Sequence, residues 1–176
     1  LEAAGARVRR ISLPELSELN DLIAQHGVLA GAEALVLHHD RIYGAEAQQM
    51  DARVVRRIKL AESMSAVDLL TLQQARARTM ASTAETIGKA IVLCPTTPET
   101  AMETAPLEAD QDAFFRANVL TLRNTSLGNF LDWCGVSIPN GTDGDGMPTG
   151  FLLSAPSGED AALLAAALGC EEIIRG

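Results

Sequence analysis

Glycine and proline are unevenly spread along this chain, and their distribution constrains the fold more than any other feature. Neither residue occurs between Ala45 and Ile87, whereas ten of the 21 glycines and prolines lie between Gly128 and Gly158. Because both residues disfavour helix interiors, the first stretch is predicted to be helical almost throughout and the second to hold short strands and turns. The chain is therefore expected to be an α/β protein, and its 47% of apolar residues suffices for a sizeable core.

The apolar segments 91–94 and 136–139 are predicted to be strands of one sheet with helices on both faces. The continuous run 90–94 suits a central strand that is buried on both faces. The segments 136–139 and 149–155 form two further strands, joined by the turn residues 143–146. Apolar and charged residues roughly alternate around Val8, which predicts another short strand near the N-terminus.

Helix boundaries follow from proline and from capping residues. Pro14 opens a helix that is expected to reach about Tyr43. Gly27 and Gly31 are expected either to bend this helix or to let another backbone approach it closely. Two further helices are expected to begin after capping residues: one after Ser65, which forms a capping box with Asp68, and one after Asp110, which reaches about Leu120. The segment Ser157–Asp160 is expected to cap a last helix, which covers residues 161–168 and is ended by Gly169.

The charge balance and the cysteines exclude several classes of protein. With 14 Lys and Arg against 23 Asp and Glu, the net charge of −9 argues against a nucleic-acid partner, and the basic cluster 53–59 is interpreted as a solvated helix face. No apolar run reaches the roughly 18 residues of a membrane-spanning helix. Three widely spaced cysteines, Cys94, Cys134 and Cys170, argue against a disulfide framework and indicate a reducing cytoplasm.

No complete catalytic constellation can be assembled from the residues alone. A Gly-x-Ser-x-Gly elbow and a phosphate loop are both missing from the sequence. Lys59 and Ser63 lie one helical turn apart and are interpreted as a surface pair. The run 140–146 does not supply calcium ligands at the required spacing and is predicted to be a tight turn. Neither a metal nor a cofactor is expected.

The C-terminal third resembles amidase signature enzymes. Members of that family typically show an asparagine, a proline ten residues later, a glycine two further on and then a G-x-P-x-G run; these positions are filled by Asn129, Pro139, Gly141 and the run 146–150. The segment 93–98 is similar to the family's "lxPTxP" segment, and Asp132 with Cys134 is closest in pattern to allophanate hydrolases. The resemblance is strong from 91 to 164 and weaker before.

The resemblance implies that residues 1–176 form one compact unit, the C-terminal half of the amidase signature fold, with a mixed β-sheet flanked by helices. The first residue, Leu1, is in keeping with the interior of a longer protein. The family's nucleophilic serine, its second serine in a cis peptide and its lysine base belong to the N-terminal half. Nothing here matches them, because Ser63 and Ser65 have no neighbouring glycine. No catalytic residue is therefore assigned in this chain.

Three residues are candidates for lining the substrate pocket. Asn129 and Asp132 are polar residues in an apolar stretch, so they need partners if they are buried, and Asp132 is expected to be at least half-buried. Both can either pin the glycine-rich loops or line the pocket. Arg123 resembles a basic position near the pocket rim, with a solvated surface arginine as the alternative.

The function implied by the resemblance is that of part of an amidase, which cleaves a carboxamide C–N bond through a serine acyl-enzyme. One alternative is the A subunit of an amidotransferase, and another is a non-catalytic binding module that retains half of the fold. The expected partners are a small amide substrate and the N-terminal half of the same fold. An unpaired sheet edge where that half would dock makes a homo-oligomer a further expectation.

Overall fold

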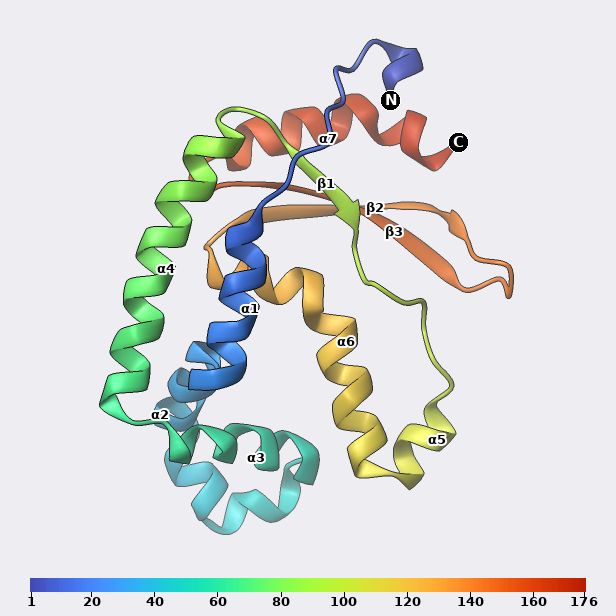
Figure 1. Ribbon diagram of the computed structural model, residues 1–176. Coiled ribbons are helices and arrows are strands. Elements are labelled where there is room, and N and C mark those ends of the chain that lie inside the picture. Colours follow the sequence, from blue (N-terminus) through green and yellow to red (C-terminus); the bar gives the residue numbers. More distant parts are fainter. The chain divides into compact units, whose positions relative to one another are not determined.

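The computed structural model describes residues 1–176 and confirms the α/β class (Figure 1). We expected one compact unit, whereas the contacts within the chain group into two. Unit 1 comprises residues 1–13 and 80–176, and unit 2 comprises residues 14–79. None of the helices is long and apolar enough to span a membrane.

Unit 1 is built on a three-stranded sheet that contains all three strands predicted in the second half of the sequence. The strands β1 (Val92–Pro95), β2 (Cys134–Thr142) and β3 (Pro148–Ala155) lie in the order β1-β3-β2. Both pairings are antiparallel, so the three strands of this chain form an antiparallel sheet rather than the mixed sheet that we expected. The prediction that β1 is a central, fully buried strand is wrong. In this chain β1 is an edge strand that pairs only with β3, and it is half-buried.

The core of unit 1 lies between one face of this sheet and α7 (Asp160–Arg175). Alternate strand residues, among them Ile138 and Leu153, point towards Leu163 and Ala167 of the helix. We expected Gly169 to end this helix, but α7 continues to Arg175. The continuation is stabilised because Cys170 and Ile174 extend the apolar face against the core, which offsets the roughly 1 kcal/mol cost of a glycine inside a helix.

On the other side of the sheet lies α6 (Gln111–Phe130), preceded by the short α5 (Thr104–Ala109) (Figure 1). The predicted cap is confirmed, since the side chain of Asp110 accepts a hydrogen bond of 2.8 Å from the backbone N–H of Asp112. The helix runs beyond the predicted end at Leu120 and finishes on the buried Phe130. The asparagine side chain of Asn124 donates to the carbonyl of Pro95 at 2.8 Å, which ties α6 to the end of β1.

The strand predicted around Val8 does not form. A 3₁₀ turn, η1 (Glu2–Ala4), is followed by irregular backbone as far as Leu13. The guanidinium of Arg9 donates to the carbonyl of Thr86 at 3.4 Å, so this segment contacts a helix end. A strand needs a hydrogen-bonded neighbour, and the sheet of this chain consists of the other three strands.

Unit 2 is entirely helical. It contains α1 (Pro14–His26), α2 (Leu29–Tyr43), α3 (Ala52–Lys59) and the first part of α4 (Ala66–Ile87), with the 3₁₀ turns η2 (Ala45–Gln49) and η3 (Leu60–Ser63). The single helix expected from Pro14 to Tyr43 is broken after His26. Gly27 adopts a φ of 95°, which favours glycine, and a Cβ there would lie 2.9 Å from Cγ and Sδ of Met64.

The capping box at the start of α4 is confirmed. The backbone N–H of Asp68 donates to Oγ of Ser65 at 3.1 Å, and the backbone N–H of Ser65 donates to Oδ2 of Asp68 at 2.9 Å. These reciprocal bonds satisfy two donors that a helix start otherwise leaves without partners.

Candidate functional site

The three segments that carry the family resemblance meet on the sheet face opposite α7. Oγ1 of Thr96, just after β1, lies 2.5 Å from Oγ of Ser137 in β2, and the two hydroxyls approach each other over Gly150 of the middle strand. We call Thr96, Ser137 and Gly150 the hydroxyl cluster. A Cβ on Gly150 would lie 2.7 Å from Oγ of Ser137 and 2.8 Å from Oγ1 of Thr96, so the close approach requires glycine.

Further hydrogen bonds fix the segment that follows β1. The backbone N–H of Thr96 donates to the carbonyl of Gly150 at 2.9 Å, and Oγ1 of Thr97 donates to the carbonyl of Glu99 at 2.7 Å. A hydrogen bond from the Thr100 side chain, and then backbone N–H groups including that of Met147, lower the pKa of Asp143. The segment is thus held to Gly150 of the middle strand and to the turn at the tip of the β2–β3 hairpin.

The tip itself is the tight turn predicted from the sequence. Oδ1 of Asp143 accepts the backbone N–H groups of Asp145 and Met147, each at 2.9 Å. A carboxylate oxygen that accepts neighbouring backbone N–H groups organises a turn by itself.

Cys94 lies on the same sheet face as Ser137, because both residues pair with Leu152 of the middle strand. Burial raises the pKa of the Cys94 thiol, so the thiol form prevails at neutral pH. The two hydroxyls hydrogen-bond to each other rather than to a basic side chain. Such a cluster can donate and accept hydrogen bonds, but it lacks the base that a nucleophilic hydroxyl requires.

Asn129 and Asp132 lie together at the C-terminal end of α6. The backbone N–H of Asp132 donates to the carbonyl of Asn129 at 3.3 Å, and both residues are exposed. The expectation that Asp132 is at least half-buried is wrong: its flanking residue Leu131 takes the buried position, while Asp132 turns outward with a φ of 59°.

Asp132 joins two loops. Oγ of Ser157 donates to Oδ2 of Asp132 at 2.9 Å, which links the turn before β2 to the turn after β3. Ser157 was expected to cap α7, but the N-cap residue is Glu159 and no side chain bonds there, because the hydroxyl of Ser157 is directed to Asp132 instead. The geometry therefore supports the loop-pinning interpretation of Asp132.

Arg123 lies elsewhere on α6. It is exposed and borders an open hollow of about 440 Å³. The other residues that line this hollow belong to the same helix: Phe115, Arg116, Val119 and Leu120. The structure thus places Asn129 and Asp132 side by side and leaves Arg123 outside that pair.

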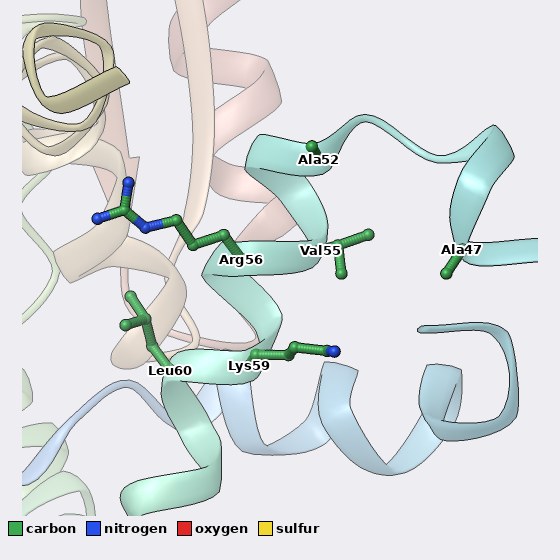
Figure 2. Close-up of a pocket in the computed structure, with 6 residues that line it drawn as sticks. All are labelled: Ala47, Ala52, Val55, Arg56, Lys59 and Leu60. Atoms are coloured by element: carbon green, nitrogen blue, oxygen red, sulfur yellow. The ribbon is translucent and has the colours of Figure 1, made fainter. Parts of the chain in front are cut away.

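A second open hollow, of about 460 Å³, lies in unit 2 along α3 and η2 (Figure 2). Its lining residues are Ala47, Ala52, Val55, Arg56, Lys59 and Leu60. Nζ of Lys59 lies 4.4 Å from the ring centroid of Tyr43, and Oγ of Ser63 donates to the carbonyl of Leu60 at 3.0 Å. Lys59 and Ser63 therefore have separate partners, in keeping with a surface pair rather than a nucleophile and its base.

Neither the hydroxyl cluster nor Asn124 was predicted to belong to a site. Thr96, Ser137 and Gly150 all belong to the segments of the family resemblance, which was the available signal. What those segments do not reveal is the strand order that brings two hydroxyls together across the middle strand.

Known proteins support the resemblance over nearly the whole chain. The sequence matches the Amidase family over residues 1–164. It is 31% identical over 175 residues to 2-amino-5-chloromuconic acid deaminase of Comamonas testosteroni, covering 99% of this chain and 37% of that protein. The S177A allophanate hydrolase of Kluyveromyces lactis superposes with a TM-score of 0.73 at 22% identity, over 93% of this chain and 26% of that one.

A 6-aminohexanoate cyclic dimer hydrolase structure determined with its substrate has the same fold as this chain, with a TM-score of 0.72 at 20% identity. That similarity covers 99% of this chain and 39% of the hydrolase. The chain thus spans little more than a third of the curated relative that it matches. Because its sequence matches the family over residues 1–164, the chain belongs to the Amidase family.

Proposed function

We propose that this chain is the C-terminal portion of an amidase that hydrolyses the C–N bond of a small carboxamide. The observation that carries the proposal is the family match over residues 1–164, in a chain whose own side chains form no nucleophile site. In this proposal a serine outside residues 1–176 attacks the carbonyl carbon and the amine leaves with a proton. Water then hydrolyses the acyl-enzyme to the carboxylic acid. A second serine and a lysine from the N-terminal half of the fold serve as the base.

The contribution of this chain is to shape and hold one wall of the site. The hydroxyl cluster and Asn124 fix the segment after β1, and the bond between Ser157 and Asp132 holds the two turns at the other end of the strands. Asn129, Asp132 and Arg123 remain candidates for lining the pocket, although the bond from Ser157 favours loop pinning for Asp132. Positioning of this kind accounts for large rate effects when it places the reacting atoms within attack distance.

The test compares two proteins: the complete product of the open reading frame that encodes this chain, and residues 1–176 alone with a verified mass of 18.6 kDa. The complete product should release ammonia or amine from a panel of carboxamides and react with a serine-directed fluorophosphonate. Residues 1–176 alone should do neither. Labelling of one serine in the isolated chain, together with turnover, would place the nucleophile within these residues and overturn the proposal.

A second candidate function follows from the named relative, which is aligned over 99% of this chain. Its name describes the loss of an amino group from an unsaturated amino acid, and that reaction also releases ammonia. The two functions are distinguished by the organic product. A carboxamide yields a new carboxylate, whereas deamination leaves oxygen on the carbon that carried the amino group. If the complete product acts on neither class, a non-catalytic module is the better description.

A further inference from the structure

The hollow along α3 in unit 2 offers apolar surface to a small molecule (Figure 2). Its volume of about 460 Å³ lies within the range of roughly 300–1,000 Å³ that is typical of ligand sites. The space is open because Ala47 and Ala52 carry only a methyl group each, and the larger apolar side chains on its wall are those of Val55 and Leu60. Leu60 is 64% exposed, so a ligand with an apolar body would remove this surface from water.

Two basic side chains border this apolar surface. Arg56 and Lys59 both belong to α3 and extend from it in opposite directions (Figure 2). The chain as a whole carries a net charge of −9, so its surface in general repels anions. The hollow is therefore a place where the local charge is opposite to that of the whole chain and attracts an anion.

The ammonium group of Lys59 is held in position by an aromatic ring. Its Nζ lies 4.4 Å from the ring centroid of Tyr43, and the face of such a ring attracts a cation. The ring is fixed in turn, because its hydroxyl donates to the carboxylate of Glu62 and the imidazole of His39 packs on it at a centroid distance of 4.8 Å. An ammonium has three hydrogen-bond donors, so those that point away from the ring are available to a ligand.

Lys59 is half-buried and makes no ion pair. The nearby carboxylates are already engaged by other side chains: Glu62 by Tyr43, Asp51 by Arg53 at 2.6 Å, and Glu46 by Arg41 at 3.5 Å. Partly buried charges are usually paired, because burial removes part of their hydration. An anion bound in the hollow would supply this pairing for Lys59.

We infer that the hollow binds a small organic carboxylate, whose anionic group pairs with Lys59 and whose apolar body lies on Val55 and Leu60. Arg56 adds to the positive potential that attracts the anion. The apolar wall favours a carboxylate with a hydrocarbon chain over acetate or inorganic phosphate, which have little or no apolar surface to bury. The inference concerns unit 2 alone and does not depend on the proposed amidase activity.

The test is an NMR titration of the full chain with hexanoate at low salt. The dissociation constant should be on the order of 1 mM, as expected for so small a ligand in an open hollow. The amide signals of residues 43–63 should shift, and those of unit 1 should not. Hexanol has the carbon chain without the charge and acetate has the charge without the chain, so each should bind at least about 5-fold more weakly.

Two variants test the two parts of the site separately. Lys59→Met keeps an apolar stem without the charge and should weaken hexanoate binding about 3- to 10-fold. Ala52→Leu keeps both cations but fills the hollow, and it should weaken binding to a similar extent. Lys89→Met is the matched control and should bind as wild type, because Lys89, the other lysine of the chain, is exposed and belongs to unit 1.

Several results would overturn the inference. One is hexanoate binding no tighter than that of acetate, or signal shifts that lie outside residues 43–63. Another is an unchanged dissociation constant in Lys59→Met or in Ala52→Leu, or an equal loss in Lys89→Met. If Lys59→Met does not fold, Ala52→Leu and the comparison with hexanol decide the question, because Ala52 lies at the exposed start of α3.

Discussion

The two units of this chain are held together in different ways. In unit 1, α7 and the three strands enclose a continuous apolar cluster whose members, such as Ile138 and Leu163, come from elements far apart in the sequence. In unit 2, successive helices contact one another, and the hydrogen bonds of His26 and Ser65 with Asp68 join the end of α1 to the start of α4. Unit 2 also buries apolar side chains, among them Leu19, Ile42 and Leu72. Both units therefore depend on apolar packing, but unit 1 packs a helix against strands, whereas unit 2 packs helices against one another.

The largest expected effect is on the packing of unit 1. Leu163 is 1% exposed beneath the sheet, so Leu163→Ala should lower the free energy of unfolding by about 2–5 kcal/mol. The matched control is Leu164→Ala, because its neighbour Leu164 is 54% exposed and should change stability by no more than about 0.5 kcal/mol. Urea denaturation of both variants measures the contrast. Similar losses would show that α7 does not bury the face described here.

A smaller loss of unfolding free energy is expected at Gly150, where the hydroxyls of Thr96 and Ser137 approach the middle strand closely. Gly150→Ala introduces a Cβ 2.7 Å from Oγ of Ser137, which should cost about 1–3 kcal/mol of unfolding free energy. Adding Ser137→Ala removes one of the opposed atoms and should recover part of that loss. Gly144→Ala is the control, since a Cβ there meets nothing within 4 Å. If thermal unfolding shows Gly150→Ala to be as stable as wild type, the hydroxyl cluster is not packed over Gly150.

Asp132→Ala separates loop pinning from pocket lining. Loss of the bond from Ser157 should lower the free energy of unfolding by about 1 kcal/mol, and Ser157→Ala should cost about as much. The double variant should then be little worse than either single one, because both remove the same bond. If Asp132 instead lines the pocket, the complete enzyme should retain its melting temperature and lose turnover. A variant unchanged in both measurements would contradict both roles.

The smallest expected effect concerns acid sensitivity in unit 2. The pKa of Asp68 is lowered to about 2 in the folded chain, against roughly 3.9 for an unfolded aspartate. A lowered folded pKa means that the ionised carboxylate stabilises the fold above about pH 4 and that this stabilisation is lost as the pH falls towards 2. Wild type should therefore be more stable than Asp68→Asn at neutral pH, and the difference should shrink between about pH 4 and pH 2. Chemical denaturation at several pH values measures it, and a constant difference would contradict the assignment.

Local signals in the sequence predicted the local features of the fold. The caps at Ser65 and Asp110 are confirmed because their bonds join residues two or three positions apart, within the reach of a sequence pattern. The sequence did not predict that the helix breaks at Gly27, because the residue that packs against Gly27 is Met64, which lies far along the chain. An apolar run likewise predicted β1 without revealing that β1 lies at the edge of the sheet, because the pattern does not specify its neighbours.

The candidate site was predictable to the same limited extent. The resemblance marked the segments around Thr96, Ser137 and Gly150, but the contact between the hydroxyls depends on strand order and register. Asp132 was expected to be half-buried from its apolar neighbours, yet a left-handed backbone conformation at the helix end directs it outward. Such a conformation is set by the turn as a whole rather than by the identity of the adjacent residues.

The bond between His26 and Asp68 affects how the length of this chain can vary. Because His26 and Asp68 are joined by a hydrogen bond, the intervening residues begin and end at almost the same point in space. The entropy of closing such a loop grows slowly, by about 0.6 kcal/mol for each doubling of its length. Insertions or deletions between residues 28 and 63 should therefore alter the helices and turns of this segment while leaving the paths of α1 and α4 unchanged. This makes the segment a place where related chains can differ in size at little thermodynamic cost.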